Sequence, residues 1–395
     1  MSGPERWLLP EGIEEVLPDE ARRLEAMRRQ VLDLFVTWGY EPVMPPMIEY
    51  LEALLTGVGK ELDLQTFKLT DQMSGRMMGA RADMTPQAAR IDAHYLKRKG
   101  PARLCYIGPA LRTRPDEFAG SRELLQLGAE LFGHSGPASD AEVLRLMITT
   151  LRTIGIDNLH IDLGNVAVFR GLTSLSGIDS EQESSLFEAM QRKAEAEIRQ
   201  MLENWSVDPA VGEMLVNLVD LNGDASTLDR AQETLAGAPD AVKRALEELR
   251  QVAGRVQLHM PDYALHFDLA ELSGYDYHTG IVFSAFVPGH GKALANGGRY
   301  DGIGEAFGRR RSATGFSTDL RQLMRLSSEK EETLAGILAP DVEDEALRNT
   351  IIRLRSKGER VIQVLPGQEV LADELGCDRE LVNEKGSWGV KTLSR

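Results

Sequence analysis

Carboxylate, amide and hydroxyl side chains recur at short, regular spacings in two segments of the chain. The segment RADMT carries Asp83 and Thr85, and the segment LLQLGAELFG carries Gln126 and Glu130. Carboxylates pair with ammonium groups through strong, charge-assisted hydrogen bonds. This set of residues therefore suits a small ligand that bears an amine. A solvated sheet face or a structural ion pair would use the same residue types.

Basic and aromatic side chains in two other segments could complete such a site. The segment LRTRP carries Arg112 and Arg114, and a guanidinium can bind a carboxylate through two parallel hydrogen bonds. The segment YDYHTG adds Tyr277 and His278 at the predicted start of a strand. A single histidine in that position is more often structural than functional.

The alternation of apolar and polar residues predicts the strands that would position these side chains. ARLCYIGPALRTR and RELLQLGAELFG each have the pattern of a strand, and the polar segment PDEFAGS joins them. Residues i and i+4 of a strand point to the same face. Gln126, Gly128 and Glu130 are therefore predicted to form one polar face. The opposite face would carry Leu125, Leu127, Ala129 and Leu131.

Runs of strands with helices at their ends indicate an α+β domain with a mixed, mainly antiparallel sheet. Apolar residues at helical spacing predict a helix over residues 19–38, and a last helix of the domain is expected near Ser317. Charged, alanine-rich sequence over residues 168–255 predicts an all-helical insertion. The domain would cover residues 1–326, and a small β-α-β domain would follow over residues 334–395.

Composition and motifs argue against several classes of protein. The formal net charge of −16 weighs against a protein that holds nucleic-acid phosphates. The chain has no apolar run long enough to span a membrane, and its N-terminus does not resemble a signal peptide, so we expect a cytoplasmic protein. Nucleotide-binding patterns and metal-ligand spacings of cysteine or histidine are missing, so no cofactor and no metal site are predicted.

In chain order, five segments resemble the catalytic core of the histidyl-tRNA synthetases, a class II synthetase family, over about residues 5–326. GYEPVMPPMIE resembles the first class motif, with Pro46 at the position of the dimer-interface proline. RADMT resembles the family's RPEGT segment, and YIGPALRTRP with SRELLQLGAELFG resembles the second class motif. LSGYDYHTG and GGRYDG resemble two histidine-specific segments, and TGFSTDLRQLM stands where the third motif belongs. Matches in this order are highly specific.

The chain departs from the synthetase pattern at positions that bind ATP. Ser273 replaces an arginine that contacts the substrate carboxylate and the α-phosphate. Gln322 replaces the arginine that holds the γ-phosphate, and Asp319 replaces a glycine of the same motif. The loop RTRP is also one residue shorter than the family's RHERP. Each lost charge-assisted contact costs about 1.5–3 kcal/mol, so the resemblance implies that this chain does not form an adenylate.

The amino-acid side of the pocket is retained. The residues that match, or that keep the charge, are Asp83, Thr85, Gln126, Glu130 and Tyr277, and His278 stands where the synthetases usually have a tyrosine. The implied contacts of histidine are its ammonium with Asp83, Thr85 and Gln126, its imidazole with Glu130 and Tyr277, and its carboxylate with Arg112 or Arg114.

A chain that has lost the ATP contacts but retained the amino-acid pocket resembles the regulatory subunits of ATP phosphoribosyltransferase, which are paralogues of the synthetases. The resemblance implies a non-catalytic partner of a short catalytic subunit, a separate chain that joins ATP to phosphoribosyl pyrophosphate in histidine biosynthesis. It also implies L-histidine as a feedback effector, a homodimer of this chain within a hetero-oligomer, and no tRNA substrate. Residues 334–395 would be the remnant of an anticodon-binding domain.

Three alternatives remain at this point. An active histidyl-tRNA synthetase would have arginines at positions 273 and 322, where the chain has Ser273 and Gln322. A ligase for another amino acid would keep the ATP-binding arginines and change the amino-acid pocket. A purely structural scaffold would bind no histidine, and the sequence alone does not distinguish it.

Overall fold

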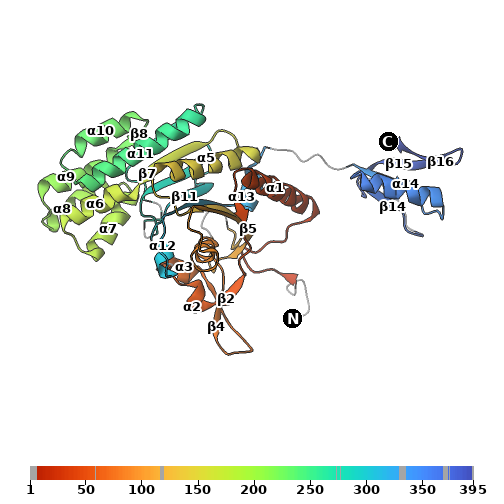
Figure 1. Ribbon diagram of the computed structural model, residues 1–395, viewed down its shortest axis with the longest axis horizontal. Coiled ribbons are helices and arrows are strands. Elements are labelled where there is room, and N and C mark those ends of the chain that lie inside the picture. Colours follow the sequence, from red (N-terminus) through yellow and green to blue (C-terminus); the bar gives the residue numbers. More distant parts are fainter. Residues whose placement is uncertain are drawn as a thin grey trace. The chain divides into compact units, whose positions relative to one another are not determined.

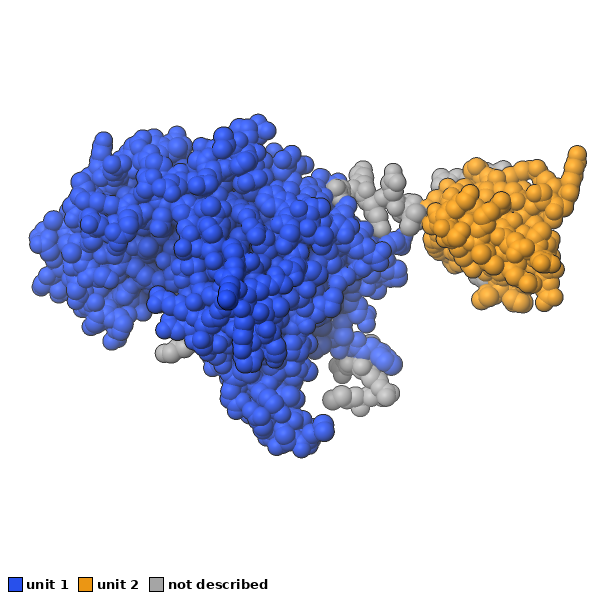
Figure 2. Space-filling model, in the orientation of Figure 1, with its two compact units in different colours: residues 1–329 blue, residues 330–395 orange. Residues whose placement is uncertain are grey.

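The computed structural model consists of two compact units, residues 1–329 and residues 330–395 (Figure 2). The residues that it describes are 7–57, 59–115, 120–272, 274–275, 277–328, 335–367, 372 and 374–393. Ser273, at which the chain departs from the synthetase pattern, lies outside the described residues. Within the described part, no helix is both long and apolar enough to cross a membrane.

A nine-stranded sheet organises the described residues of the first unit (Figure 1). Its strands run in the order β1-β5-β6-β12-β11-β10-β7-β9-β8. Its members are β1 (Glu41–Pro42), β5 (Ala102–Leu111), β6 (Glu123–Phe132), β7 (His160–Asn165), β8 (Asn222–Gly223), β9 (Leu265–Asp268), β10 (Ile281–Phe286), β11 (Ala295–Arg299) and β12 (Ala313–Asp319). Neighbours pair antiparallel except for two parallel pairs, β1 with β5 and β7 with β9. The predicted α+β class with a mainly antiparallel sheet is confirmed.

Three long helices cover one face of this sheet and complete the main hydrophobic core. They are α1 (Pro18–Thr37), α5 (Pro137–Thr153) and α11 (Asp240–His259). The predicted apolar stripe of α1 is buried, because Leu24, Met27, Val31 and Phe35 recur every three or four residues along one side of the helix. Leu127, Ala129 and Leu131 of β6 join this core from the sheet, as their alternation predicts.

The predicted helical insertion is helical over most of its length, and its helices extend slightly beyond both predicted ends. Its helices are α6 (Val166–Ser176), α7 (Ser180–Gln191), α8 (Glu195–Asn204), α9 (Pro209–Asn217), a 3-10 turn η3 (Leu218–Asp220), α10 (Ser226–Thr234) and α11. Asp179 begins α7 with a capping box that involves Gln182. The short strand β8 interrupts the helices and pairs with β9, so the insertion also contributes one strand to the sheet.

A second, three-stranded sheet precedes the helix that carries Thr85. It consists of β2 (Ile48–Tyr50), β4 (Met77–Ala80) and β3 (Phe67–Thr70), and the neighbouring helices are α2 (Leu51–Leu54), α3 (Lys60–Gln65), α4 (Thr85–Arg90) and the π-helix η2 (Ile91–Leu96). Arg81 fixes the segment between β4 and α4, because its guanidinium donates to the carbonyls of Pro45 and Pro109 at 2.6 and 2.7 Å. Asp83 and Thr85 are thereby placed at the start of α4.

The last helix of the first unit begins later than predicted. β12 continues to Asp319, and α13 covers Leu320–Leu326 rather than starting near Ser317. Asp319 explains the boundary, because its Oδ1 accepts hydrogen bonds from the backbone nitrogens of Arg321 at 3.1 Å and Leu125 at 3.0 Å. An aspartate that caps the first turn in this way favours a helix that begins directly after it.

The second unit contains a β-α-β arrangement and an additional hairpin. Its elements are β13 (Gly336–Ala339), α14 (Glu345–Ser356), β14 (Val361–Gln363), β15 (Cys377–Glu384) and β16 (Ser387–Thr392), with the sheet order β14-β13-β15-β16. The β15–β16 hairpin was not predicted. It turns at Lys385 and Gly386, which both have positive φ angles, as a type I′ turn requires. A lysine is an unusual first residue for a type I′ turn, so the sequence does not indicate this hairpin.

Candidate functional site

Two glycines allow bulky polar side chains to lie flat on the sheet face opposite the main core. A Cβ atom at Gly315 of β12 would overlap the carboxylate of Glu130, which is on the neighbouring strand β6. A Cβ atom at Gly128 would overlap the hydroxyl of Tyr106 in the same way. The predicted polar face of β6 is therefore real, and it is buried rather than solvated.

Glu130 lies at the centre of a hydrogen-bonded network and is only 1% exposed. Tyr106 donates to its Oε1 at 2.8 Å, and Tyr300 donates to its Oε2. Thr85 Oγ1 lies 2.8 Å from the Tyr106 hydroxyl and continues the network towards α4. A buried carboxylate with two hydroxyl donors is held in one orientation, which is what a binding site requires.

Burial raises the pKa of Glu130 to about 8, and the negative charge of Asp83 acts in the same direction. The hydrogen bonds from Tyr300 and Tyr106 oppose this change but do not cancel it. With that pKa, the carboxyl group is mostly protonated at neutral pH. It can then donate a hydrogen bond to a neutral nitrogen, or release its proton when a cationic ring binds.

Asp83 and Gln126 form the second part of the network. Gln126 Nε2 donates to Asp83 Oδ1 at 2.9 Å, and the backbone nitrogen of Thr85 donates to the same oxygen at 2.8 Å. The backbone nitrogen of Met84 donates to Gln126 Oε1 at 2.8 Å. These bonds fix a carboxylate that is partly exposed, so Asp83 presents negative charge at the open side of the network.

Tyr277 lies beside this network with a hydroxyl that is not used. Its ring stacks on Tyr300, with 4.9 Å between the centroids and 23° between the planes. Its hydroxyl oxygen is buried and has no hydrogen-bond partner among the described residues. His278 meets Tyr277 edge-on at 5.6 Å, and its ring lies over Gly298 of β11. An unpaired buried hydroxyl costs free energy, so a ligand atom that pairs with it would bind favourably.

Two basic side chains, Arg112 and Lys292, lie near the end of β5. The Nε of Arg112 is buried and has no hydrogen-bond partner in the described part of the chain. Partial burial lowers the pKa of Lys292, and the charge of Arg112 lowers it further, so the two cations lie within electrostatic range of each other. Two adjacent cations suit an anionic group such as a carboxylate. Arg114, in contrast, is exposed in the loop after β5, and no hydrogen bond to the described network residues fixes it.

Two of the positions that differ from the synthetase motif, Asp319 and Gln322, have structural contacts here. Asp319 caps α13 and binds the backbone of β6, as described above. Gln322 Nε2 lies 2.7 Å from His290 Nε2, and Arg321 forms an ion pair with Glu123 at 3.1 Å. These side chains therefore hold α13 and the neighbouring strand ends together.

The structure thus brings Asp83, Thr85, Gln126, Glu130 and Tyr277 into one cluster, with His278 against Tyr277 and Arg112 beside Lys292. Sequence reasoning missed Tyr106, Tyr300 and Lys292. Tyr106 could have been found, since it lies two residues before Gly108 on a predicted strand and therefore points to the same face as that glycine. The segment GGRYDG alone indicates only a turn, and Lys292 lies in a loop without a pattern.

Two family models match the chain and together span nearly all of it. A model described as histidyl-tRNA synthetase matches residues 12–323. A model described as ATP phosphoribosyltransferase subunit HisZ C-terminal domain matches residues 334–391. The two matches fall on the two compact units, one on each.

Full-length relatives share more than half of their residues with this chain. A protein of Thioalkalivibrio sulfidiphilus, named ATP phosphoribosyltransferase regulatory subunit, is 56% identical over 395 residues, which is 100% of both chains. A protein of Ectopseudomonas mendocina with the same name is 54% identical over 396 residues, again covering 100% of each.

Solved structures share the fold. An ATP phosphoribosyltransferase regulatory subunit/histidyl-tRNA synthetase from Bacillus halodurans is 27% identical with a TM-score of 0.81, over 94% of this chain and 96% of that one. A histidyl-tRNA synthetase from Nostoc sp. PCC 7120 is 22% identical with a TM-score of 0.79, over 95% and 91%. The predicted class II synthetase-like fold is therefore confirmed.

Proposed function

The chain belongs to the family of ATP phosphoribosyltransferase regulatory subunits, and from that membership we propose that it activates a separate, short catalytic subunit and makes it sensitive to L-histidine. The chain itself carries out no adenylation. One observation supports this most strongly: the polar network around Glu130 is intact, whereas Asp319 and Gln322 are engaged in structural contacts.

Histidine's ammonium binds at Asp83. The carboxylate of Asp83 is partly exposed and is oriented by Gln126 and by the backbone of Thr85. Gln126 Oε1 accepts from Met84 and keeps a second lone pair, because an amide oxygen can accept twice. Gln126 therefore serves mainly to position Asp83 and adds one weaker contact of its own.

The imidazole binds between Glu130 and Tyr277. The Tyr277 hydroxyl is buried without a partner, so it can pair with one ring nitrogen. Glu130 pairs with the other, as a donor when it is protonated and as an acceptor when it is charged. The carboxylate of the ligand then extends to Arg112, whose buried Nε has no hydrogen-bond partner among the described residues, with the positive charge of Lys292 nearby.

The chain forms a homodimer through the region around Pro46. A groove there is lined by Pro46, Ile48, Tyr50, Tyr95 and other residues. Ile48, Tyr50 and Tyr95 are among the exposed large hydrophobic residues, with Tyr95 70% exposed. Exposed apolar patches of this kind mark protein interfaces, and Pro46 stands at the dimer-interface position of the class motif. The dimer joins the catalytic subunit in a hetero-oligomer.

The proposed assembly works in the cytoplasm, where ATP and phosphoribosyl pyrophosphate are available to the catalytic subunit, and it does not act on tRNA. The net charge of −16 supports the last point, since a protein that holds tRNA phosphates needs basic surface.

The test has two parts, binding and activity. L-histidine is titrated into the purified chain by calorimetry, and ATP–phosphoribosyl pyrophosphate condensation is assayed with the short catalytic subunit, with and without this chain. We expect histidine binding, and activity that depends on this chain and falls as histidine rises. Pyrophosphate release by this chain alone, dependent on histidine and ATP, would instead identify a working synthetase.

A further inference from the structure

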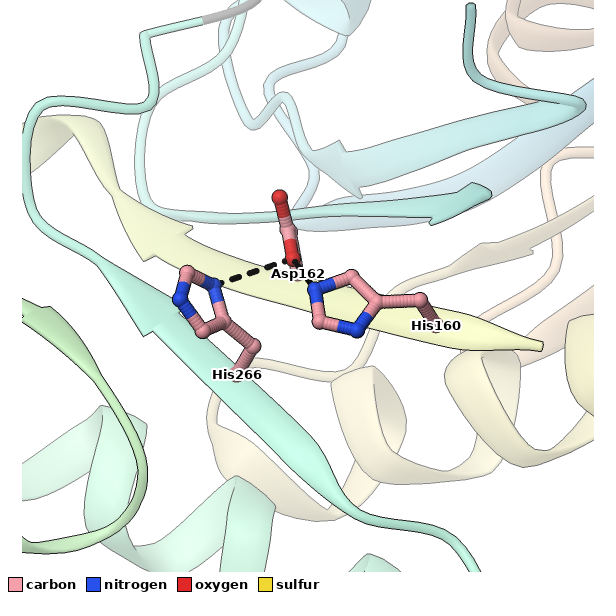
Figure 3. A group of neighbouring side chains, drawn as sticks. All are labelled: His160, Asp162 and His266. Carbon is pink, nitrogen blue, oxygen red and sulfur yellow. Dashed lines mark ion pairs between the residues drawn. The ribbon is translucent and has the colours of Figure 1, made fainter. Parts of the chain in front are cut away.

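Two histidines and an aspartate converge on the sheet, away from the Glu130 network (Figure 3). His160 and Asp162 are alternate residues of β7 and therefore point to the same face. His266 on β9 is paired in register with Asp162. The three residues thus come from adjacent parallel strands that are distant in the sequence, which is why no motif reveals them.

In this cluster, which we call the His-Asp-His cluster, both histidines lie within ion-pair distance of Asp162, yet two buried polar atoms form no hydrogen bond. His160 Nε2 lies 2.8 Å from Asp162 Oδ1, and His266 Nδ1 lies 3.1 Å from the same oxygen. Both Asp162 Oδ1 and His266 Nδ1 are buried, yet neither has a hydrogen-bond partner among the described residues. The nitrogens are thus close to the oxygen without the alignment that a hydrogen bond needs.

We propose that the His-Asp-His cluster binds a divalent first-row transition metal ion, with Zn²⁺ as the representative. Two imidazoles and a carboxylate are a donor set that such ions favour. The three ligand atoms all lie within 4.8 Å of one another. Tetrahedral ligands at about 2.0–2.2 Å from zinc lie about 3.3 Å apart, so small side-chain rotations suffice to admit the ion.

The ion's remaining ligands can come from solvent. The His160 side chain is 54% exposed and that of His266 is 31% exposed, so water reaches the outer side of the cluster. Mg²⁺ and Ca²⁺ are poor candidates, because they prefer oxygen donors and this site offers two nitrogens.

A bound ion would join the two strands that flank the helical insertion. β7 leads directly into α6, and β9 follows α11 at the other end of the insertion. An ion that binds only the folded arrangement stabilises it by mass action. The metal would therefore hold together the base of the insertion and take no part in binding histidine.

The experiment titrates ZnCl₂ into the chelator-treated, full-length chain by calorimetry, in a buffer without L-histidine, which itself binds zinc. We expect one equivalent per chain and a higher midpoint of thermal unfolding with zinc present. Loss of a residue that hydrogen-bonds to a metal ligand weakens metal binding about 10–100-fold. Asp162→Asn and His266→Ala change a proposed ligand itself, so they should weaken zinc binding by at least about 100-fold.

Matched variants keep the test decisive. His259→Ala removes an exposed histidine at the end of α11 and should leave the affinity unchanged. If His266→Ala fails to fold, His160→Gln replaces it, since the His160 side chain is mostly exposed. The proposal is overturned if the wild-type chain binds no zinc. Wild-type affinity in the folded Asp162→Asn and His160→Gln variants would overturn it equally.

Discussion

The carboxylate of Glu130 occupies the space above Gly315, its partner on the neighbouring strand, so no side chain can be accommodated there. This arrangement lets two tyrosines reach the carboxylate and hold it in place. Because Glu130 is the central residue of the network, its replacement is the most direct test of the proposed histidine site.

Replacement of Glu130 by alanine should weaken feedback inhibition without preventing assembly. The variant would lose the group that is proposed to face the imidazole, and the assembly surface should stay unchanged because Glu130 is buried. A charge-assisted hydrogen bond contributes about 1.5–3 kcal/mol, so the inhibitory histidine concentration should rise by at least about tenfold. Size-exclusion chromatography with the catalytic subunit is the control. Unchanged inhibition would disprove the pocket assignment.

Replacement of Tyr277 by phenylalanine should weaken histidine binding without lowering the stability of the free protein. The buried hydroxyl has no hydrogen-bond partner in the described structure, so its removal takes no hydrogen bond from the folded chain and relieves the cost of an unpaired polar group. Calorimetry should show about tenfold weaker binding. Tyr300→Phe is the matched control, because it removes a hydrogen bond to Glu130 and should lower the free energy of unfolding by about 1 kcal/mol. Equal destabilisation by both variants would contradict this distinction.

Replacement of Arg112 by alanine should discriminate between ligands with and without a carboxylate. L-histidine should bind about tenfold to a hundredfold more weakly, because the variant would lose the charge-assisted contact that is proposed for Arg112. Histamine, which lacks the carboxylate, should bind the variant and the wild type alike. Arg114→Ala serves as the control, since Arg114 is exposed and not fixed by the network. A parallel loss for both ligands would show that Arg112 does not contact the carboxylate.

Replacement of Asp319 by alanine should lower the free energy of unfolding by about 0.5–2 kcal/mol, as expected for the loss of a helix cap. The backbone nitrogens of Arg321 and Leu125 would both lose their acceptor. Asp319→Asn keeps an oxygen at this place and should recover most of the loss. Chemical denaturation followed by circular dichroism measures both variants, and an alanine variant as stable as the wild type would exclude the capping role.

The titration of Glu130 should make the stability of the chain depend on pH. Its pKa is about 8 in the folded chain against an ordinary value of 4.5. The folded chain therefore retains a proton that the unfolded chain releases, so stability falls as the pH rises between these two values, by up to about 1.4 kcal/mol per pH unit. Glu130→Gln cannot titrate and should show a flatter profile over that range. Parallel profiles would mean that Glu130 keeps an ordinary pKa.

The sheet and the helical insertion could be predicted because their apolar residues follow regular periods. The alternation on β6 placed Gln126 and Glu130 on one face, and burial of Leu127 and Leu131 on the other face confirms the register. The start of α13 was misplaced because Asp319 both caps the helix through Arg321 and binds the backbone of Leu125 on β6, a contact between residues distant in the sequence.

The network partners were harder to predict for a related physical reason. Tyr106 and Tyr300 matter because the fold brings their hydroxyls within hydrogen-bond distance of Glu130. Each tyrosine lies in a segment that also has an ordinary structural explanation. The same holds for Lys292, whose relevance arises only from its proximity to Arg112. Identity of residues indicated which groups could bind a ligand, but only the fold shows which of them meet.

The parallel pairing of β7 with β9 has a consequence for attempts to shorten the chain. Antiparallel strands can be rejoined by a two-residue hairpin, whereas parallel neighbours need a crossover of about a dozen residues or more. The helical insertion is that crossover. A shortened chain would have to keep a crossover of that kind, because a tight turn in its place would leave β9 unable to reach its position beside β7.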